Sequence, residues 1–243
     1  MTTWVFVRGL IRSQFHWHEF PQHFKHHVAP EKILFLELPG NGTRCQESSP
    51  YSIRSMAKDF WQQLKPIEDR DLRFVAISMG AMIAIEMAIQ KPQCVKQLHL
   101  INTSLGRYSP PWKRMQLKTL FALAPNLFSI HARERAILRW TSNNPIDDTL
   151  LHAWTNEQIQ NPTRLPNALK QVLAASRYQG PIAPPIDRTV FYASKMDRLV
   201  NSECSQAIAT HWQKNIRFHP NAGHDLPLDD PQWLAETIIA ESK

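Results

Sequence analysis

The sequence is poor in cysteine and contains neither a long apolar run nor a leader-like start. Its three cysteines, Cys45, Cys94 and Cys204, are odd in number and widely spaced, which predicts neither a disulfide framework nor a zinc site. No apolar run approaches the roughly 18 residues of a membrane span. The first residues lack the charged segment and long apolar stretch of a secretory signal. We therefore expect a cytoplasmic protein without a metal or cofactor.

Acidic residues are scarce in one segment, residues 105–185. Ten basic residues accompany four acidic ones there, so the segment carries +6 of the total net charge of +7. The basic residues are Arg107, Lys113, Arg114, Lys118, Arg133, Arg135, Arg139, Arg164, Lys170 and Arg177. No helix-turn-helix, zinc finger or aromatic-basic motif accompanies this charge, so a nucleic-acid partner is not expected.

The patterning of the rest predicts alternating strands and helices. Strands are expected over residues 3–9, 33–37, 72–77, 97–102, 188–193 and 216–219, and helices over 15–26, 52–64, 79–91 and from 231 onward. Such alternation indicates an α/β fold with a mainly parallel sheet of about six strands, covered by helices on both faces. Residues 105–185 contain no convincing strand and helix-like stretches near 112–123, 130–140, 147–159 and 166–177. We expect a core domain of residues 1–104 and 186–243, with an inserted helical lid of residues 105–185.

The most informative stretch is an apolar strand that passes through one serine into a buried helix. Ser78 stands between Ala76 and Gly80, and a tight strand-to-helix turn needs small residues at those two positions. The turn would place Ser78 at a helix N-terminus, which favours developing negative charge. A serine is also a common helix N-cap, however, so this stretch alone does not decide between a structural and a nucleophilic role.

A base and an acid follow the serine at suitable places. His224 lies in a loop after the last predicted strand, and Asp197 lies in the loop after the preceding one. The carboxyl ends of parallel strands meet at one edge of the sheet, so all three should lie near one another. An imidazole can take the serine proton, and a carboxylate can hold the imidazole in the required tautomer.

The order Ser78, Asp197, His224 resembles that of the α/β-hydrolase superfamily, and the resemblance covers nearly the whole chain. Further matching stretches are residues 7–10, 37–42, 197–200 and 223–225. The resemblance implies an α/β-hydrolase fold and an oxyanion hole made by the backbone N–H groups of Leu10 and Met79. Two residues depart from the family's usual pattern: Ala76 replaces a glycine, and Arg8 stands where many relatives have histidine.

Other candidate residues have simpler interpretations. His16, His18, His23, His26 and His27 cluster near the N-terminus, but acidic and cysteine ligands are sparse there, which disfavours a metal site. His219 competes with His224 as the base, although it lies at a strand end without the Gly-His loop. Asp225, Asp229 and Asp230 are interpreted as caps of the last helix. The tryptophans of the insert, Trp112, Trp140 and Trp154, are expected to pack it, with one or two lining an acyl pocket.

These residues predict a serine hydrolase that cleaves a carboxylic ester or thioester. Its basic lid suggests an anionic substrate or an acidic carrier protein, although charges on such a segment are commonly only its solvated face. Neutralising Arg133, Arg135 and Arg139 should then raise KM for an anionic ester only. The alternatives are a non-catalytic ligand-binding protein of the same fold and a carbon–carbon bond hydrolase with the same triad.

Overall fold

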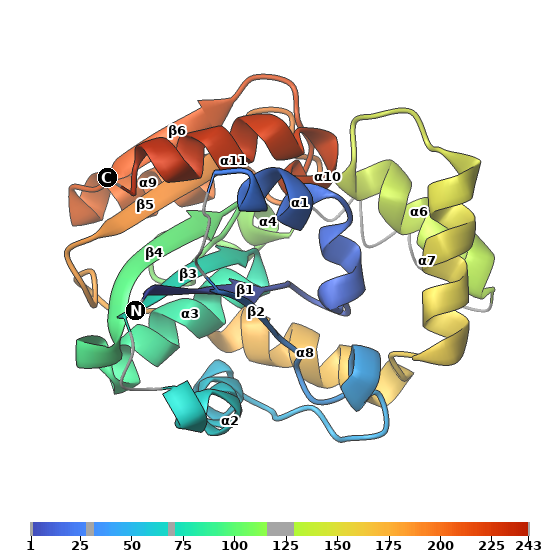
Figure 1. The fold of residues 1–243 in the computed structure, drawn as a ribbon, viewed down its shortest axis with the longest axis horizontal. Coiled ribbons are helices and arrows are strands. Elements are labelled where there is room, and N and C mark those ends of the chain that lie inside the picture. The colour runs from blue at the N-terminus through green and yellow to red at the C-terminus, as the bar shows by residue number, and fades with distance from the viewer. Residues whose placement is uncertain (1, 28–31, 68–70, 116–128, 243) are drawn as a thin grey trace.

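A parallel sheet of six strands forms the centre of the molecule (Figure 1). The computed structural model describes residues 2–27, 32–67, 71–115 and 129–242. The strands are β1 (Thr2–Val7), β2 (Lys32–Leu36), β3 (Asp71–Ile77), β4 (Val95–Ile101), β5 (Thr189–Ser194) and β6 (Asn215–His219). They lie in the order β2-β1-β3-β4-β5-β6, and every neighbouring pair is parallel. The predicted six-stranded α/β fold is confirmed.

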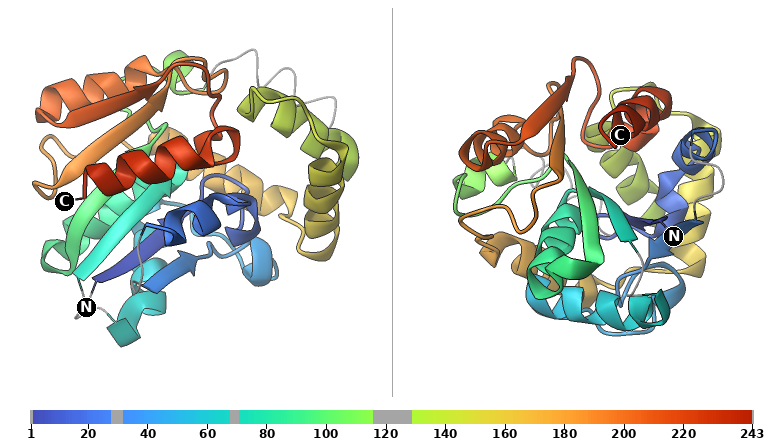
Figure 2. Two further views of the ribbon diagram at one scale, coloured as in Figure 1. Left: turned by 45° about the horizontal axis from the view of Figure 1, so that its top comes forward. Right: turned by 60° about the vertical axis from the view of Figure 1, so that its left-hand side comes forward.

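Helices cover both faces of the sheet. On one face, α2 (Ile53–Leu64), α3 (Met79–Gln90) and α9 (Glu203–Trp212) bury apolar residues against alternate strand residues such as Phe74. On the other face, α1 (Phe20–Lys25) and α11 (Pro231–Ala240) pack over the intervening residues, Val75 among them (Figure 2). Side chains of successive strand residues point to opposite faces, so the central strands β1, β3, β4 and β5 bury most of their residues on both sides.

In the segment between β4 and β5, the regular elements that the structure describes are all helices, joined by loops. It comprises α4 (Pro111–Arg114), α6 (Ile130–Thr141), α7 (Asp148–Gln160) and α8 (Leu165–Arg177). Three of these helices match the predicted stretches, whereas most of the stretch expected at 112–123 lies outside the described residues. Helices α6 and α7 stand to one side of the sheet, and α8 runs back beneath it (Figure 1). We call residues 105–185 the insert.

Two predictions of local structure were wrong or incomplete. The single helix expected over residues 15–26 is a short 3-10 turn, Gln14–Trp17, followed by α1, because His18 adopts a left-handed φ of 49° between them. Helix α9 was not predicted, since its sequence is rich in short and polar residues and shows no long apolar stripe. None of the helices in the described ranges has the length and apolar character that a bilayer crossing requires.

Candidate active site

Ser78 occupies the sharp turn between β3 and α3. Its φ of 58° and ψ of −122° lie in a region that side-chain-bearing residues seldom adopt, and such strain clusters at functional sites. The turn is held in place because Ser78 N donates to Ile101 O at 2.8 Å and Thr103 Oγ1 donates to Ser78 O at 3.0 Å. The hydroxyl is therefore carried by a rigid backbone.

Two glycines allow the chain to pass close to this turn. A Cβ at Gly80 would lie 2.5 Å from the carbonyl oxygens of both Val7 and Arg8, so only glycine lets α3 approach the end of β1. A Cβ at Gly9 would lie 3.1 Å from the Ser78 Cβ and 3.6 Å from its Oγ. The small residues of the turn thus bring the loop after β1 against Ser78.

His224 and Asp197 are joined by a short hydrogen bond. His224 Nδ1 donates to Asp197 Oδ2 at 2.7 Å, and their side chains are 8% and 1% exposed. The other carboxylate oxygen, Oδ1, accepts the backbone N–H groups of Leu199 and Val200 at 2.8 and 2.9 Å. These bonds fix the carboxylate, and among the residues that the structure describes no hydrogen bond is made to the other ring nitrogen, His224 Nε2.

Asn102, at the end of β4, is bonded to the loop of residues 220–225 that carries His224, which we call the histidine loop. Its φ is 45°, and its side-chain amide donates to His224 O at 2.8 Å and to Ser194 Oγ at 3.0 Å. Its side-chain oxygen, Oδ1, accepts the backbone N–H of Ser194 at 2.8 Å. The two strand ends and the histidine loop are therefore tied together at one residue.

A cavity of about 360 Å³ opens above Ser78. Ser78 and His224 both line it, as does Leu10 from the loop after β1, and Met79 is the buried first residue of α3. The rest of the lining is mostly apolar and comes largely from the insert: Met115, Ile137, Trp140, Leu165, Ala168, Leu169 and Val172. Among the described hydrogen bonds, none joins Ser78 to His224, and such bonds are often long before substrate binds.

The pattern of the alpha/beta hydrolase family matches residues 4–237 of this chain. The chain belongs to that family. It is similar in fold to an esterase from Exiguobacterium antarcticum (14% identity, TM-score 0.78, 100% of this chain and 92% of that one). It is similar also to a thermophilic esterase from Thermogutta terrifontis (15%, TM-score 0.71, 98% and 88%). A third match is a lipase-esterase related protein from Clostridium acetobutylicum (14%, TM-score 0.71, 98% and 93%).

Identities this low show a shared fold alone. Among proteins with curated descriptions, none matches the chain. The family nevertheless makes this protein an α/β-hydrolase enzyme.

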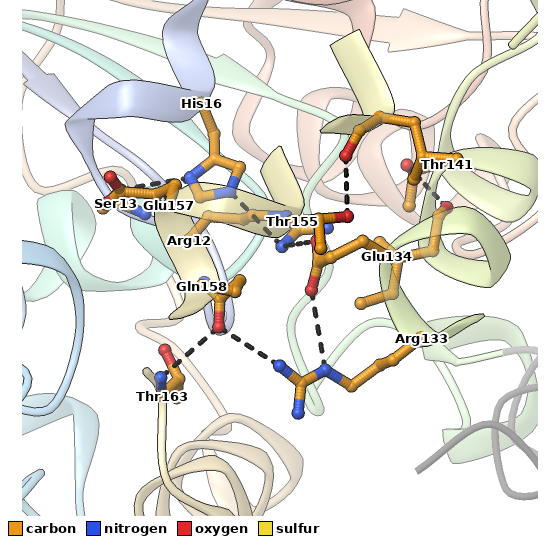
Figure 3. Close-up of polar contacts among 12 residues, drawn as sticks. Arg12, Ser13, His16, Arg133, Glu134, Thr141, Thr155, Glu157, Gln158 and Thr163 are labelled. Atoms are coloured by element: carbon orange, nitrogen blue, oxygen red, sulfur yellow. Dashed lines mark hydrogen bonds and ion pairs between the residues drawn. The ribbon is translucent and has the colours of Figure 1, made fainter. Parts of the chain in front are cut away.

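Two buried ion pairs flank the cavity of this α/β-hydrolase. Arg8 donates to both oxygens of Asp225 at 2.9 and 2.7 Å, and its guanidinium lies 5.1 Å from the centre of the Trp17 ring. Arg12 donates to Glu134 of α6 at 2.9 Å (Figure 3). Both pairs are at most 6% exposed. The Arg8–Asp225 pair joins the loop after β1 to the histidine loop. The Arg12–Glu134 pair joins the loop after β1 to the insert.

The other candidate histidines make structural contacts or are exposed. His219 Nδ1 accepts Ala222 N at 2.8 Å, Nε2 lies 3.1 Å from Asp230 Oδ2, and the ring packs on Trp233. His16 is fully buried beside Arg12 (Figure 3), and burial together with the nearby guanidinium groups holds its pKa well below the ordinary value. His18, His26 and His27 are exposed.

The structure gives some residues near the site a role different from the one that the sequence predicted. Asp225 was interpreted as a helix cap but pairs with Arg8, whereas Asp230 does cap α11 by accepting Trp233 N at 3.0 Å. Of the insert's tryptophans, Trp154 is buried, Trp140 lines the cavity and Trp112 is 64% exposed.

Proposed function

We propose that this chain is a serine hydrolase that cleaves carboxylic esters or thioesters through an acyl-enzyme on Ser78. The observation that carries the proposal is the shared cavity. A strained serine at a helix N-terminus faces the same apolar space as a histidine whose other ring nitrogen is bonded to a buried carboxylate. A serine that only capped α3 would not need this arrangement, and its side chain makes no capping hydrogen bond.

The proposed reaction has two acyl-transfer steps. Ser78 Oγ attacks the carbonyl carbon as His224 Nε2 takes its proton, and Asp197 stabilises the imidazolium. His224 then returns that proton to the leaving alkoxide or thiolate. Water, activated by His224, attacks the acyl-enzyme and releases the acid. The backbone N–H groups of Leu10 and Met79 are proposed to stabilise the oxyanion, since Met79 directly follows Ser78 and Leu10 directly follows Gly9, which lies against Ser78.

The lining of the cavity supports an apolar acyl group. Leu165, Leu169 and Trp140 present hydrocarbon to the space beside Ser78, and burial of apolar surface stabilises a bound chain by about 25 cal/mol per Å². The two arginines that line the cavity already face buried carboxylates. We therefore propose a neutral, hydrophobic acyl chain as the group held in the cavity, and the insert as the lid over it.

An acidic carrier protein or anionic leaving group remains a prediction. Several basic side chains of the insert already have partners within the chain: Arg135 lies 3.4 Å from Asp148, Lys113 lies 2.6 Å from Glu203, and Arg114 donates to α8 carbonyls. Arg139 is exposed and has no ion pair among the described residues. Such a partner would thus depend on described basic residues that face no carboxylate, Arg139 among them.

The proposal is tested with a series of p-nitrophenyl esters of increasing acyl length and with matching acyl thioesters. The wild-type protein should hydrolyse them, and kcat/KM should rise with chain length until the cavity is filled. Ser78→Ala should lose at least about a thousandfold in kcat, because no nucleophile remains. Equal activity of Ser78→Ala and wild type would refute the proposal.

A further inference from the structure

We propose that Gln171, on helix α8 of the insert, is a positioning residue for the turn that carries the Leu10 amide. The inference rests on the proposed function, because that amide matters only if an oxyanion forms at Ser78. Gln171 lies outside the cavity lining and touches none of the three residues Ser78, Asp197 and His224 through a described hydrogen bond. Its effect would be transmitted through Ile11.

Residues 9–12 form a tight turn of an unfavourable kind. Arg12 N donates to Gly9 O at 3.4 Å, which closes a four-residue turn, and its third residue, Ile11, has a φ of 51°. Turns with a positive φ at that position normally carry glycine or asparagine there. A β-branched side chain is a genuine outlier in this region, so the surroundings must hold it there.

Gln171 supplies the hydrogen bond that holds this residue. Its Oε1 accepts the backbone N–H of Ile11 at 2.9 Å. Its Nε2 donates to Asn41 Oδ1 at 2.8 Å and to Ser49 Oγ at 3.0 Å, and the side chain is fully buried. Asn41 in turn donates to Arg12 O at 3.1 Å. The amide of Gln171 is thus fixed in one orientation, with its oxygen toward Ile11.

The direction of the Ile11 N–H distinguishes the observed turn from its more favourable alternative. A turn with negative φ at the third residue differs by a rotation of the peptide between the second and third residues, here Leu10 and Ile11. That rotation would turn the Ile11 N–H away from Gln171 and bring the Leu10 carbonyl toward it. The Leu10 N–H belongs to the neighbouring peptide, between Gly9 and Leu10. Without the bond, relaxation of the turn displaces that peptide and moves the Leu10 N–H away from the proposed oxyanion.

The same helix also contacts the proposed acyl group. Leu165, Ala168, Leu169 and Val172 of α8 line the cavity, and Gln171 is buried beneath them. Helix α8 therefore has two effects: it forms part of the acyl pocket, and it holds the turn of residues 9–12. An acyl group that packs against α8 and holds it in place would therefore stabilise the transition state as well as contribute to substrate binding.

The test compares Gln171→Met, which keeps the size of the side chain but removes both polar atoms, with Asn167→Leu. Asn167 lies one turn away on α8, is buried, and bonds Ser49 N and Glu47 O at 3.0 and 2.9 Å without touching residues 9–12. It is a matched anchor of the insert. Hydrolysis of a p-nitrophenyl ester is measured together with labelling of Ser78 by a fluorophosphonate.

Gln171→Met should lower kcat by about 10- to 100-fold, less than the loss of a whole oxyanion donor, with KM within about threefold of wild type. Asn167→Leu should stay within about threefold of wild type in kcat. The deciding comparison is made in an Ile11→Gly background, because glycine adopts a positive φ without strain. There, adding Gln171→Met should change kcat by less than about threefold.

Each outcome decides. If Gln171→Met lowers kcat when residue 11 is isoleucine but not in the Ile11→Gly variant, the role of Gln171 is supported. An unchanged kcat in Gln171→Met, the same loss in both backgrounds, or an equal loss in Asn167→Leu overturns it, while a labelled and active wild type leaves the proposed function standing. A folded wild type that neither labels nor hydrolyses refutes the proposed function itself.

Discussion

Arg8 and Asp225, 217 residues apart in sequence, form a buried pair with two hydrogen bonds of 2.9 and 2.7 Å. Arg8 directly precedes Gly9, and Asp225 directly follows His224. The pair therefore connects the loop that holds the proposed oxyanion donor with the loop that holds the proposed base. An arginine at this place, where many α/β-hydrolases have histidine, has its own partner in this chain.

Removing one member of this pair should lower the free energy of unfolding much more than removing both. Arg8→Met leaves the Asp225 carboxylate buried and unpaired, which costs about 3–5 kcal/mol of the free energy of unfolding. Arg8→Met combined with Asp225→Leu should cost clearly less, because no charge remains buried. Urea denaturation of the three proteins measures this. A double variant that is less stable than Arg8→Met would contradict the interpretation.

Gly80→Ala should damage both stability and activity. The added methyl would lie 2.5 Å from the Val7 and Arg8 carbonyl oxygens, which are backbone atoms and cannot swing away. Such overpacking costs about 1–3 kcal/mol, and the shift would move Ser78 against Gly9. Gly106→Ala is the control, because its methyl would meet the ends of the Gln179 and Arg114 side chains. Equal losses in unfolding free energy would count against the explanation.

His99 should make the protein less stable in acid. Burial lowers its pKa to about 3, so between about pH 3 and 6.5 the unfolded chain binds a proton here that the folded protein does not. The free energy of unfolding therefore falls by about 1.4 kcal/mol for each pH unit of acidification below about 6.5. His99→Gln should show a shallower dependence between pH 7.5 and 5 in denaturation experiments. Parallel curves for the two proteins would disprove this contribution.

The positive insert should matter only for charged substrates. Arg135→Gln with Arg139→Gln removes two exposed charges and leaves Arg133, which contacts Glu134 and Gln158, in place. KM for an anionic ester should rise about three- to tenfold at low salt and less at high salt, while a neutral ester of the same acyl length is unaffected. An equal change in KM for both esters would rule out electrostatic steering.

The fold and the three candidate catalytic residues were predictable because their signals are local. Ser78, Asp197 and His224 each follow a predicted strand, and their turns carry characteristic small or polar neighbours. The parallel sheet then places them at one edge, an expectation that the contacts of His224 with Asp197 and Asn102 agree with.

The supporting residues carried no such signal. Asp225 looks like a helix cap because its partner, Arg8, lies at the other end of the chain. Gln171 and Glu134 belong to amphipathic helices, where a polar residue is ordinarily solvated, and only tertiary packing buries them against the loop after β1. The positive φ of Ile11 likewise accompanies a contact far along the chain, its hydrogen bond to Gln171.

The most direct test of the central claim is labelling with a fluorophosphonate followed by peptide mapping. The reagent reacts with a serine whose proton is taken by a base, so wild type should carry one adduct on the peptide containing Ser78. Ser78→Ala should carry none, and His224→Gln should label far more slowly although it is folded. An adduct on a different serine, or equal labelling of wild type and His224→Gln, would contradict the account.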